Sequence, residues 1–287
     1  MSFAETALLG GLAGFTIYLG LPVARLRLLS NAARVGLAMF AVGILAFIFV
    51  DVISHANGIV EDALSGYKDG KSSFGHLAAV AAVLIGGFGL GSAGLGILER
   101  RLRPKGQPLS PVAGGSTAGA FTADEAALLA AQADEARRRA LQTGVVIAFA
   151  IGLHNFAEGL AIGVSARSGA ISLATVLIIG FALHNATEGF GIVGPLAGIT
   201  PSWRWLGLVG LIAGVPTFLG AMLGYQVTSE PLELAFLAVA GGAILYVIGE
   251  IWQGMRRYGH RELGLFMLTA GFAAGILTDL VVVYGGG

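Results

Sequence analysis

The chain contains no cysteine, which excludes disulfide bonds and thiolate metal ligands. Charged residues are also scarce, at 12% of the 287 residues, whereas soluble domains usually carry about 25%. Hydrophobic residues make up 55%, and this balance indicates a membrane protein. The 17 basic and 17 acidic residues cancel, so net charge gives no case for nucleic-acid binding.

Glycine is abundant, at 46 residues, and small residues let helices pack closely in a membrane. Apolar runs near the ~20 residues that cross a bilayer occur at about 5–24, 35–55, 76–98, 143–165, 171–194, 205–226, 232–253 and 263–284. We therefore predict an all-α polytopic membrane protein with eight transmembrane helices. The N-terminus carries Glu5 and lacks a basic segment, so the first run is interpreted as a retained span and not as a cleaved signal.

Basic residues are distributed unevenly among the loops between these runs. If the N-terminus lies outside, all of the 17 Lys and Arg residues fall in inside loops except Lys68, Lys71 and Arg167. Basic residues favour cytoplasmic loops. The distribution predicts eight spans with both termini outside, in a multi-pass protein of the cell (inner) membrane.

The spans and one long loop divide the chain into four segments: 1–99 with helices one to three, 100–142 as a cytoplasmic loop, 143–194 with helices four and five, and 195–287 with helices six to eight. The first half of the loop is rich in Pro, Gly and Ser and is predicted to be disordered. Its second half, Thr122 to Arg139, is predicted to be helical, because Thr122 and Glu125 form a capping-box pattern and arginines close the segment.

The pattern His-Asn-x-x-Glu-Gly occurs twice within the apolar runs, beginning at His154 and at His184. Ionisable residues inside a membrane are costly, so their default interpretation is functional. His and Glu four positions apart share one helix face, with Cβ atoms about 5–6 Å apart. Only residues 166–170 join the two spans, which forces an antiparallel pair. The two copies therefore run in opposite directions, as in many transporter binding sites.

Two imidazoles and two carboxylates would suit Zn²⁺, Fe²⁺, Mn²⁺ or Co²⁺. Mg²⁺ and Ca²⁺ favour oxygen-only sites, and Cu(I) would favour sulfur ligands. The predicted metal site consists of His154, Glu158, His184 and Glu188. Asn155 and Asn185 are expected either to add a weak oxygen ligand or to orient the glutamates.

Four further ionisable residues are candidates for the metal pathway. We expect Asp51, His55 and Glu61 to line an outer vestibule that attracts cations, the alternative being an interfacial cluster at the membrane rim. Glu250, deep in the seventh run and toward the inside, is expected to form an exit site or relay. The alternative for Glu250 is pairing with a nearby arginine.

The two motifs, the eight spans, the outside termini and the long third loop resemble the ZIP (Zrt/Irt-like) family of divalent-metal transporters, of prokaryotic type. The resemblance covers nearly the whole chain and includes Gly194-Pro195-Leu196 beyond the second motif. It implies import of Zn²⁺, or of Fe²⁺, Mn²⁺ or Cd²⁺, into the cytoplasm, with no cofactor besides the transported ion. It also implies a 3+2+3 helix arrangement with inverted pseudo-symmetry, elevator-type movement of a transport domain against a scaffold, and a homodimer.

The chain departs from the family pattern at two places. Ala157 occupies a position that is often proline, so a kink is not required there. The stretch from Ala213 to Pro216 lacks the carboxylate that many members place before this proline to support a second metal. We therefore expect one strong site, and a weaker or absent adjoining site built from Asn155, Asn185 and shared glutamates.

Two other functions were weighed against transport. In an intramembrane metalloenzyme, a Glu beside a zinc-bound water could act as general base. The motif His-Glu-x-x-His is missing, however, and we predict that the protein is not an enzyme. A metal sensor or a proton conductor without metal flux would carry the same ligands.

Overall fold

The computed structural model describes residues 1–26, 30–102, 123–169, 171–196, 199–226, 229–256 and 258–284, and every regular element in these ranges is helical. The long elements are α3 (Asn31–Lys68), α4 (Phe74–Gly89), α6 (Ala123–Arg167), α7 (Ile171–Val193), α8 (Trp203–Gln226), α9 (Glu230–Arg256) and α10 (Arg261–Tyr284). The shorter ones are α1 (Phe3–Phe15), α2 (Ile17–Gly20), η1 (Leu21–Arg25), η2 (Leu90–Gly94), α5 (Leu95–Leu102) and η3 (Gly194–Leu196).

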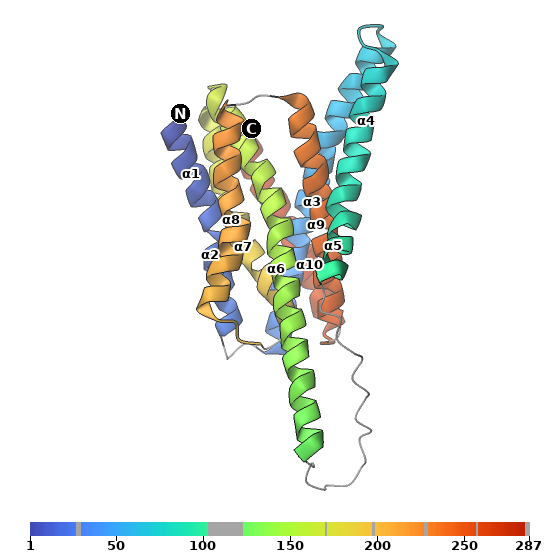
Figure 1. Ribbon diagram of the computed structural model, residues 1–287. Helices are drawn as coiled ribbons and strands as arrows, with labels where there is room; N and C mark the ends of the chain where they lie inside the picture. The colour runs from blue at the N-terminus through green and yellow to red at the C-terminus, as the bar shows by residue number, and fades with distance from the viewer. Residues whose placement is uncertain are drawn as a thin grey trace.

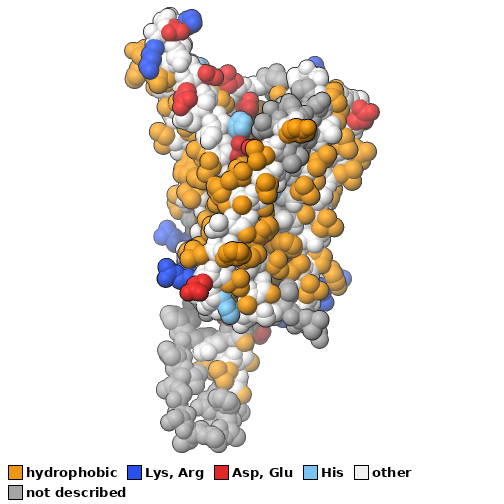
Figure 2. Space-filling model, turned by 180° about the vertical axis from the view of Figure 1, so that it is seen from behind, with side chains coloured by type: hydrophobic (Ala, Val, Ile, Leu, Met, Phe, Trp, Pro, Cys, Tyr) orange, Lys and Arg blue, Asp and Glu red, His pale blue; other side chains and the backbone are white. Residues whose placement is uncertain are grey.

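The helices form one elongated bundle (Figure 1). Helix α1 begins and α10 ends at the same end of the bundle, which we call the terminal end, and the N-terminal part of α6 projects from the opposite end. Seven described segments are long and apolar enough to cross a membrane, and α7 adds a shorter apolar stretch, Leu177–Val193. On the face that Figure 2 shows, hydrophobic side chains cover the middle and charged ones gather toward the ends. The chain is a multi-pass membrane protein.

Two helices extend well beyond the predicted spans. Helix α6 has 45 residues and runs without interruption from the predicted loop helix through the fourth span. No proline interrupts this stretch, and Ala157 leaves its second half without a proline kink. Helix α3 continues past residue 55 to Lys68 and ends before Gly70, whose φ of +70° is readily adopted by glycine. The loop residues 103–122, predicted to be largely disordered, lie outside the described residues.

Glycines bring the backbones of α1, α6 and α8 together, and a Cβ at Gly189 of α7 would lie 2.7 Å from the carbonyl oxygen of Ile17 in α2, the short helix after α1. A Cβ atom added at Gly159 of α6 would meet the carbonyl oxygen of Thr217 and lie 2.9 Å from the backbone nitrogen of Ala221, both in α8. A Cβ at Gly14 of α1 would meet the carbonyl oxygen of Gly214. None of these contacts leaves room for a side chain, so these helices are held together as an α1/α6/α7/α8 group.

The remaining long helices interlock in the same way. A Cβ at Gly43 of α3 would lie 2.7 Å from the backbone nitrogen of Phe272 in α10. A Cβ at Gly242 of α9 would lie 2.8 Å from the backbone nitrogen of Ser92, in the π-helical turn η2 that follows α4. These contacts join α3 to α10 and α9 to the segment after α4. Between the two pairs, a Cβ at Gly241 of α9 would meet the Cδ1 atom of Ile53 in α3 at 2.7 Å, and the four helices together are called the α3/α4/α9/α10 group.

The contacts between the two groups are different in kind. At Gly191 of α7 an added Cβ would first meet the Cδ1 atom of Ile251, at 3.2 Å. At Gly194 it would first meet the Cβ atom of Ala38, at 2.9 Å. At the described glycines that face the other group, an added Cβ would thus meet a side chain before it met any backbone atom. The buried apolar core fills this boundary, with residues such as Ile44 and Ile147 from either side.

Candidate metal centre

The first copy of the motif lies in the C-terminal third of α6, where the helical repeat places His154 and Glu158 on one face. The Nε2 atom of His154 is 2.9 Å from the Oε1 atom of Glu158. The two residues are almost completely buried, at 1% and 6% exposure. A histidine and a carboxylate therefore meet within a helix that is apolar enough to span a membrane.

The second copy, on α7, brings its side chains to the same place. The Nε2 atom of His184 contacts the same Oε1 atom of Glu158. One ligand atom from each of His154, Glu158 and His184 lies within 4.8 Å of the others. Glu188 completes the cluster, since its Oε1 atom is 3.8 Å from the Nε2 atom of His154. The structure thus brings together the four residues of the predicted site.

Several polar atoms of this cluster are buried without a hydrogen-bond partner. They include the Oε2 atom of Glu158, both carboxylate oxygens of Glu188 and the Nδ1 atom of His154. Buried polar groups are normally hydrogen-bonded, and unpaired ones cost free energy. A divalent cation at the Nε2 side of His154 would supply the carboxylate oxygens with a partner, so the donor set fits a metal ligated by nitrogen and oxygen.

The two motif asparagines attach the site to neighbouring helices. Asn155 Nδ2 donates to the carbonyl oxygen of Ala213 in α8 at 3.0 Å, and Asn185 Nδ2 donates to the carbonyl oxygen of Ala13 in α1 at 3.1 Å. The Oδ1 atoms of both amides are buried without a hydrogen-bond partner. The amide nitrogens thus position the motifs, and the role of the two oxygens as weak metal ligands stays a prediction.

A cavity of about 790 Å³ reaches the site from the boundary between the two helix groups. His154, Glu158 and His184 lie on its wall, together with side chains from α3, α9 and α10. Acidic residues accompany them, namely Asp51, Glu230, Glu233 and Asp279. The ligands of the α1/α6/α7/α8 group therefore face the α3/α4/α9/α10 group across an open space.

Of the three residues predicted to line an outer vestibule, the structure places two at the cavity. Asp51 and His55 line the cavity, with the Nδ1 atom of His55 3.4 Å from the Oδ1 atom of Asp51. Glu61 lies one to two turns farther along α3, accepts a hydrogen bond from Asn57 at 2.7 Å, and is not among the described residues that line the cavity. Glu250 is not among them either. Metal-binding roles for these four residues stay predictions.

Sequence reasoning passed over Glu230 and Glu233, which open α9 at the cavity. The sequence offered a signal for them. Both acids stand at the start of the seventh apolar run, and Asp51 stands toward the end of the second run, which reaches the same end of the bundle. Acids in the first turn of a helix also suit the helix dipole, which explains why they were unremarkable.

Comparison with known proteins assigns the chain to a family. A family model described as "ZIP Zinc transporter" matches residues 124–249, which include both motifs. A protein of Corynebacterium glutamicum (strain ATCC 13032) called "Zinc transporter ZupT" is 31% identical over 275 residues, covering 94% of this chain and 98% of that protein. This chain belongs to the ZIP family. Another protein called "Zinc transporter ZupT", from Clostridium perfringens (strain 13 / Type A), is 34% identical over 157 residues, covering 53% of this chain and 55% of that protein.

Helix α8 is where many ZIP proteins are expected to carry a carboxylate for a second metal ion, and where the sequence predicted that this carboxylate is missing. Helix α8 carries Pro216 in its interior, and no carboxylate precedes this proline. Thr217 is fully buried, its side chain lies against Gly14 of α1, and its hydroxyl oxygen has no hydrogen-bond partner. Among the described residues, the group of three or more histidines and carboxylates that could hold a metal ion is the one at His154.

Proposed function

We propose that this ZIP protein transports a divalent transition metal, most favourably zinc, into the cytoplasm through the site between α6 and α7. The observation that carries the proposal is the convergence of His154, Glu158 and His184 at a cavity wall inside a membrane-type bundle. Nitrogen and oxygen ligands together match the preferences of Zn²⁺. The full-length relative bears the name of a zinc transporter.

The direction of transport is argued from charge. The three basic residues expected outside lie at helix ends or turns of the terminal end: Lys68 ends α3, Lys71 follows it, and Arg167 ends α6. Arg256 and Arg261 lie at the opposite end, where α9 ends and α10 begins. By the preference of basic residues for the cytoplasm, the terminal end faces outside.

The path begins at the acidic mouth of the cavity. Asp51, with Glu233 and Asp279 nearby on the cavity wall, raises the local concentration of cations. The ion then exchanges its water for His154, Glu158, His184 and Glu188, and leaves toward Glu250. Asn155 and Asn185 hold the two motifs in position during this exchange. Glu61 and His55 line the route by which the ion reaches the cavity from outside.

Transport proceeds by movement of the α1/α6/α7/α8 group against the α3/α4/α9/α10 group. Backbone contacts at glycines and the asparagine hydrogen bonds join the helices of the α1/α6/α7/α8 group, which supports rigid-body behaviour of that group. Contacts between the groups are made by side chains, which can slide and repack. The metal ligands belong to one group and would move with it.

The helices are arranged 3+2+3 with inverted pseudo-symmetry. In that arrangement α6 is equivalent to α7, and α8 to α1. The hydrogen bond from Asn155 to α8 then corresponds to the one from Asn185 to α1. The close contact of α3 with α10 corresponds likewise to that of α9 with the η2 segment after α4. A homodimer, implied by the family resemblance, completes the proposal.

The test is uptake of radioactive zinc into liposomes that contain the purified protein. The double variant His154→Ala/His184→Ala should reduce uptake to the rate of empty liposomes, because two of the four ligands are lost. His260→Ala, which removes an exposed histidine in the loop between α9 and α10, serves as the control and should leave uptake unchanged. Unchanged uptake in the double variant would show that the site assignment is wrong.

The same assay separates the alternatives. Competition by unlabelled Fe²⁺, Mn²⁺ and Cd²⁺ ranks the metals, which ligand type alone does not distinguish. A sensor or a proton conductor would bind zinc without accumulating it. Hydrolysis of a peptide by zinc-loaded vesicles would instead indicate an intramembrane metalloenzyme.

A further inference from the structure

A second pocket, of about 470 Å³, lies where α3, α9 and α10 meet, at the end of the bundle opposite the terminal end. It is separate from the metal centre, and the two cavities share no lining residue. The loop that joins α9 to α10 forms its rim, with Gly259 at a φ of +71° allowing the tight turn.

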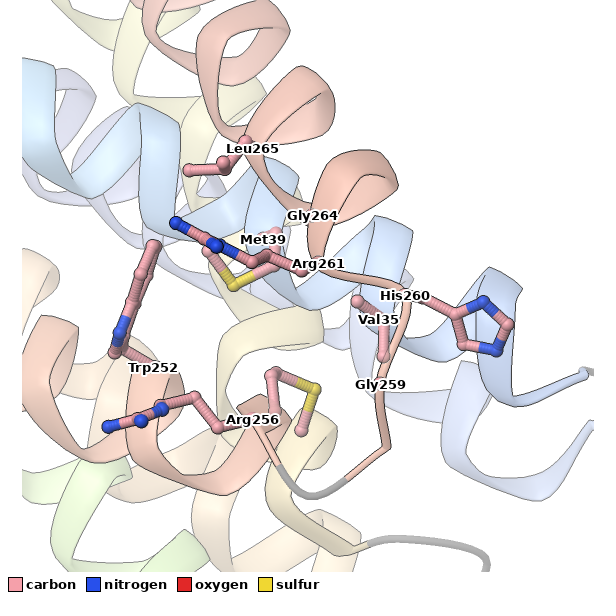
Figure 3. Close-up of a pocket in the computed structure, with 10 residues that line it drawn as sticks. Val35, Met39, Trp252, Arg256, Gly259, His260, Arg261, Gly264 and Leu265 are labelled. Atoms are coloured by element: carbon pink, nitrogen blue, oxygen red, sulfur yellow. The ribbon is translucent and has the colours of Figure 1, made fainter.

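Two arginines border this pocket from either side of the loop. Arg256 ends α9 and Arg261 begins α10, and both side chains extend toward the side of the pocket where Trp252 lies (Figure 3). His260 points away from them. The arrangement places two guanidinium groups near one indole ring, facing a common opening.

These arginines are available to a ligand. Both are exposed, and within the described ranges neither makes an ion pair or a side-chain hydrogen bond. The acidic residue next to them in the sequence is Glu262, which follows Arg261 in α10 and is also exposed. Helix α10 begins at the pocket, so the partial positive charge of its N-terminus adds to that of the arginines.

The floor of the pocket is apolar. Val35 and Met39 of α3, Met255 of α9 and Leu265 of α10 form it. The apolar surface continues outward along α10, where Leu265 is 43% and Phe266 71% exposed. A ligand that fits must therefore combine an anionic group with a hydrocarbon portion.

We propose that this pocket binds an anionic phospholipid, with the phosphate group between Arg256 and Arg261 and an acyl chain against the apolar floor. Guanidinium groups bind phosphate oxygens in bidentate fashion, and indole rings favour the interface between headgroups and hydrocarbon. Basic pockets between helices at the cytoplasmic side are the usual form of such sites. The lipid would hold the α3/α4/α9/α10 group at the inner leaflet.

The test uses native mass spectrometry of the full-length protein in detergent, with equal amounts of phosphatidylglycerol and phosphatidylcholine added. The wild type should retain phosphatidylglycerol preferentially. The variant R256Q/R261Q should lose about 25-fold of this preference, since each arginine near an anionic lipid surface contributes about a factor of five. The control R101Q/R204Q removes two exposed arginines outside the pocket and should keep the preference.

Equal preference in R256Q/R261Q and in the wild type would overturn the proposal. Loss of bound phosphatidylglycerol on addition of millimolar inorganic phosphate would also overturn it, because the pocket would then be a site for a soluble anion. If the double variant does not yield monodisperse protein, the single variants R256Q and R261Q replace it. Each should lose about fivefold, and no loss in either would refute the assignment.

Discussion

The contact between α6 and α8 at Gly159 gives a quantitative test of the packing that surrounds the metal site. Replacing Gly159 with alanine adds one methyl group at a point where the carbonyl oxygen of Thr217 and the backbone nitrogen of Ala221 lie within contact distance. Both obstacles are backbone, so no side-chain rotation relieves the clash. The helices must separate, and Glu158, the preceding residue, must move with them.

The magnitude follows from two opposing effects. Overpacking of this kind costs about 3 kcal/mol at the upper end of its usual range, and alanine is better than glycine in a helix by about 1 kcal/mol. Gly159→Ala should therefore destabilise the protein by about 2 kcal/mol. Gly207→Ala is the matched control, because nothing lies within 4 Å of the added methyl group. It should be neutral or stabilise the protein by up to about 1 kcal/mol.

The assay is thermal unfolding in detergent, followed by intrinsic fluorescence. A difference of about 3 kcal/mol between the variants corresponds to roughly 6–12 °C in Tm for a chain of this size class. Gly159→Ala should also bind zinc more weakly than Gly207→Ala. If Gly159→Ala is at least as stable as Gly207→Ala, then α6 and α8 are not in backbone contact, and the inference of a rigid helix group is wrong.

Three further outcomes are expected. Zinc affinity measured by calorimetry should fall at least about tenfold from pH 7 to pH 5, because coordination requires neutral imidazole and ionised carboxylate; pH-independent affinity would argue against His154 and His184 as ligands. Asn155→Ala should lower the free energy of unfolding by about 1–2 kcal/mol, through loss of the hydrogen bond to Ala213, with unfolding in detergent as the measurement. Asp51→Asn/Glu233→Gln should raise the KM for zinc uptake at low ionic strength with Vmax unchanged, and the effect should shrink in high salt; a salt-independent effect would instead indicate direct ligation.

The extent to which the sequence predicted the fold depended on the range of the interactions involved. Apolar runs predicted the positions of the membrane helices, because hydrophobicity is a local property of each segment. The polar start of α6 was predicted as a separate loop helix, but its continuity with the fourth span was not, and neither was the extension of α3 to Lys68. Neither extension is apolar enough to appear as a membrane run, and that of α3 is packed through Ala63 against Val80 of α4 and Leu234 of α9.

The candidate site shows the same division. The spacing of His154 and Glu158 placed both on one helix face, and the short link between spans predicted an antiparallel pair. That His184 reaches the very oxygen atom of Glu158 that faces His154 depends on the rotation of α7 against α6. No periodicity in one chain gives that rotation.

The sequence alone therefore determined the membrane setting, the ligand chemistry and the doubled motif, because each depends on residue types and on spacing within one helix. The tertiary structure decided which glycines hold helices together, that Glu233 shares a cavity with Asp51, and that Arg256 and Arg261 border one pocket. These relations join residues distant in the chain or separated by a turn. They arise from packing between helices, which the one-dimensional pattern does not encode.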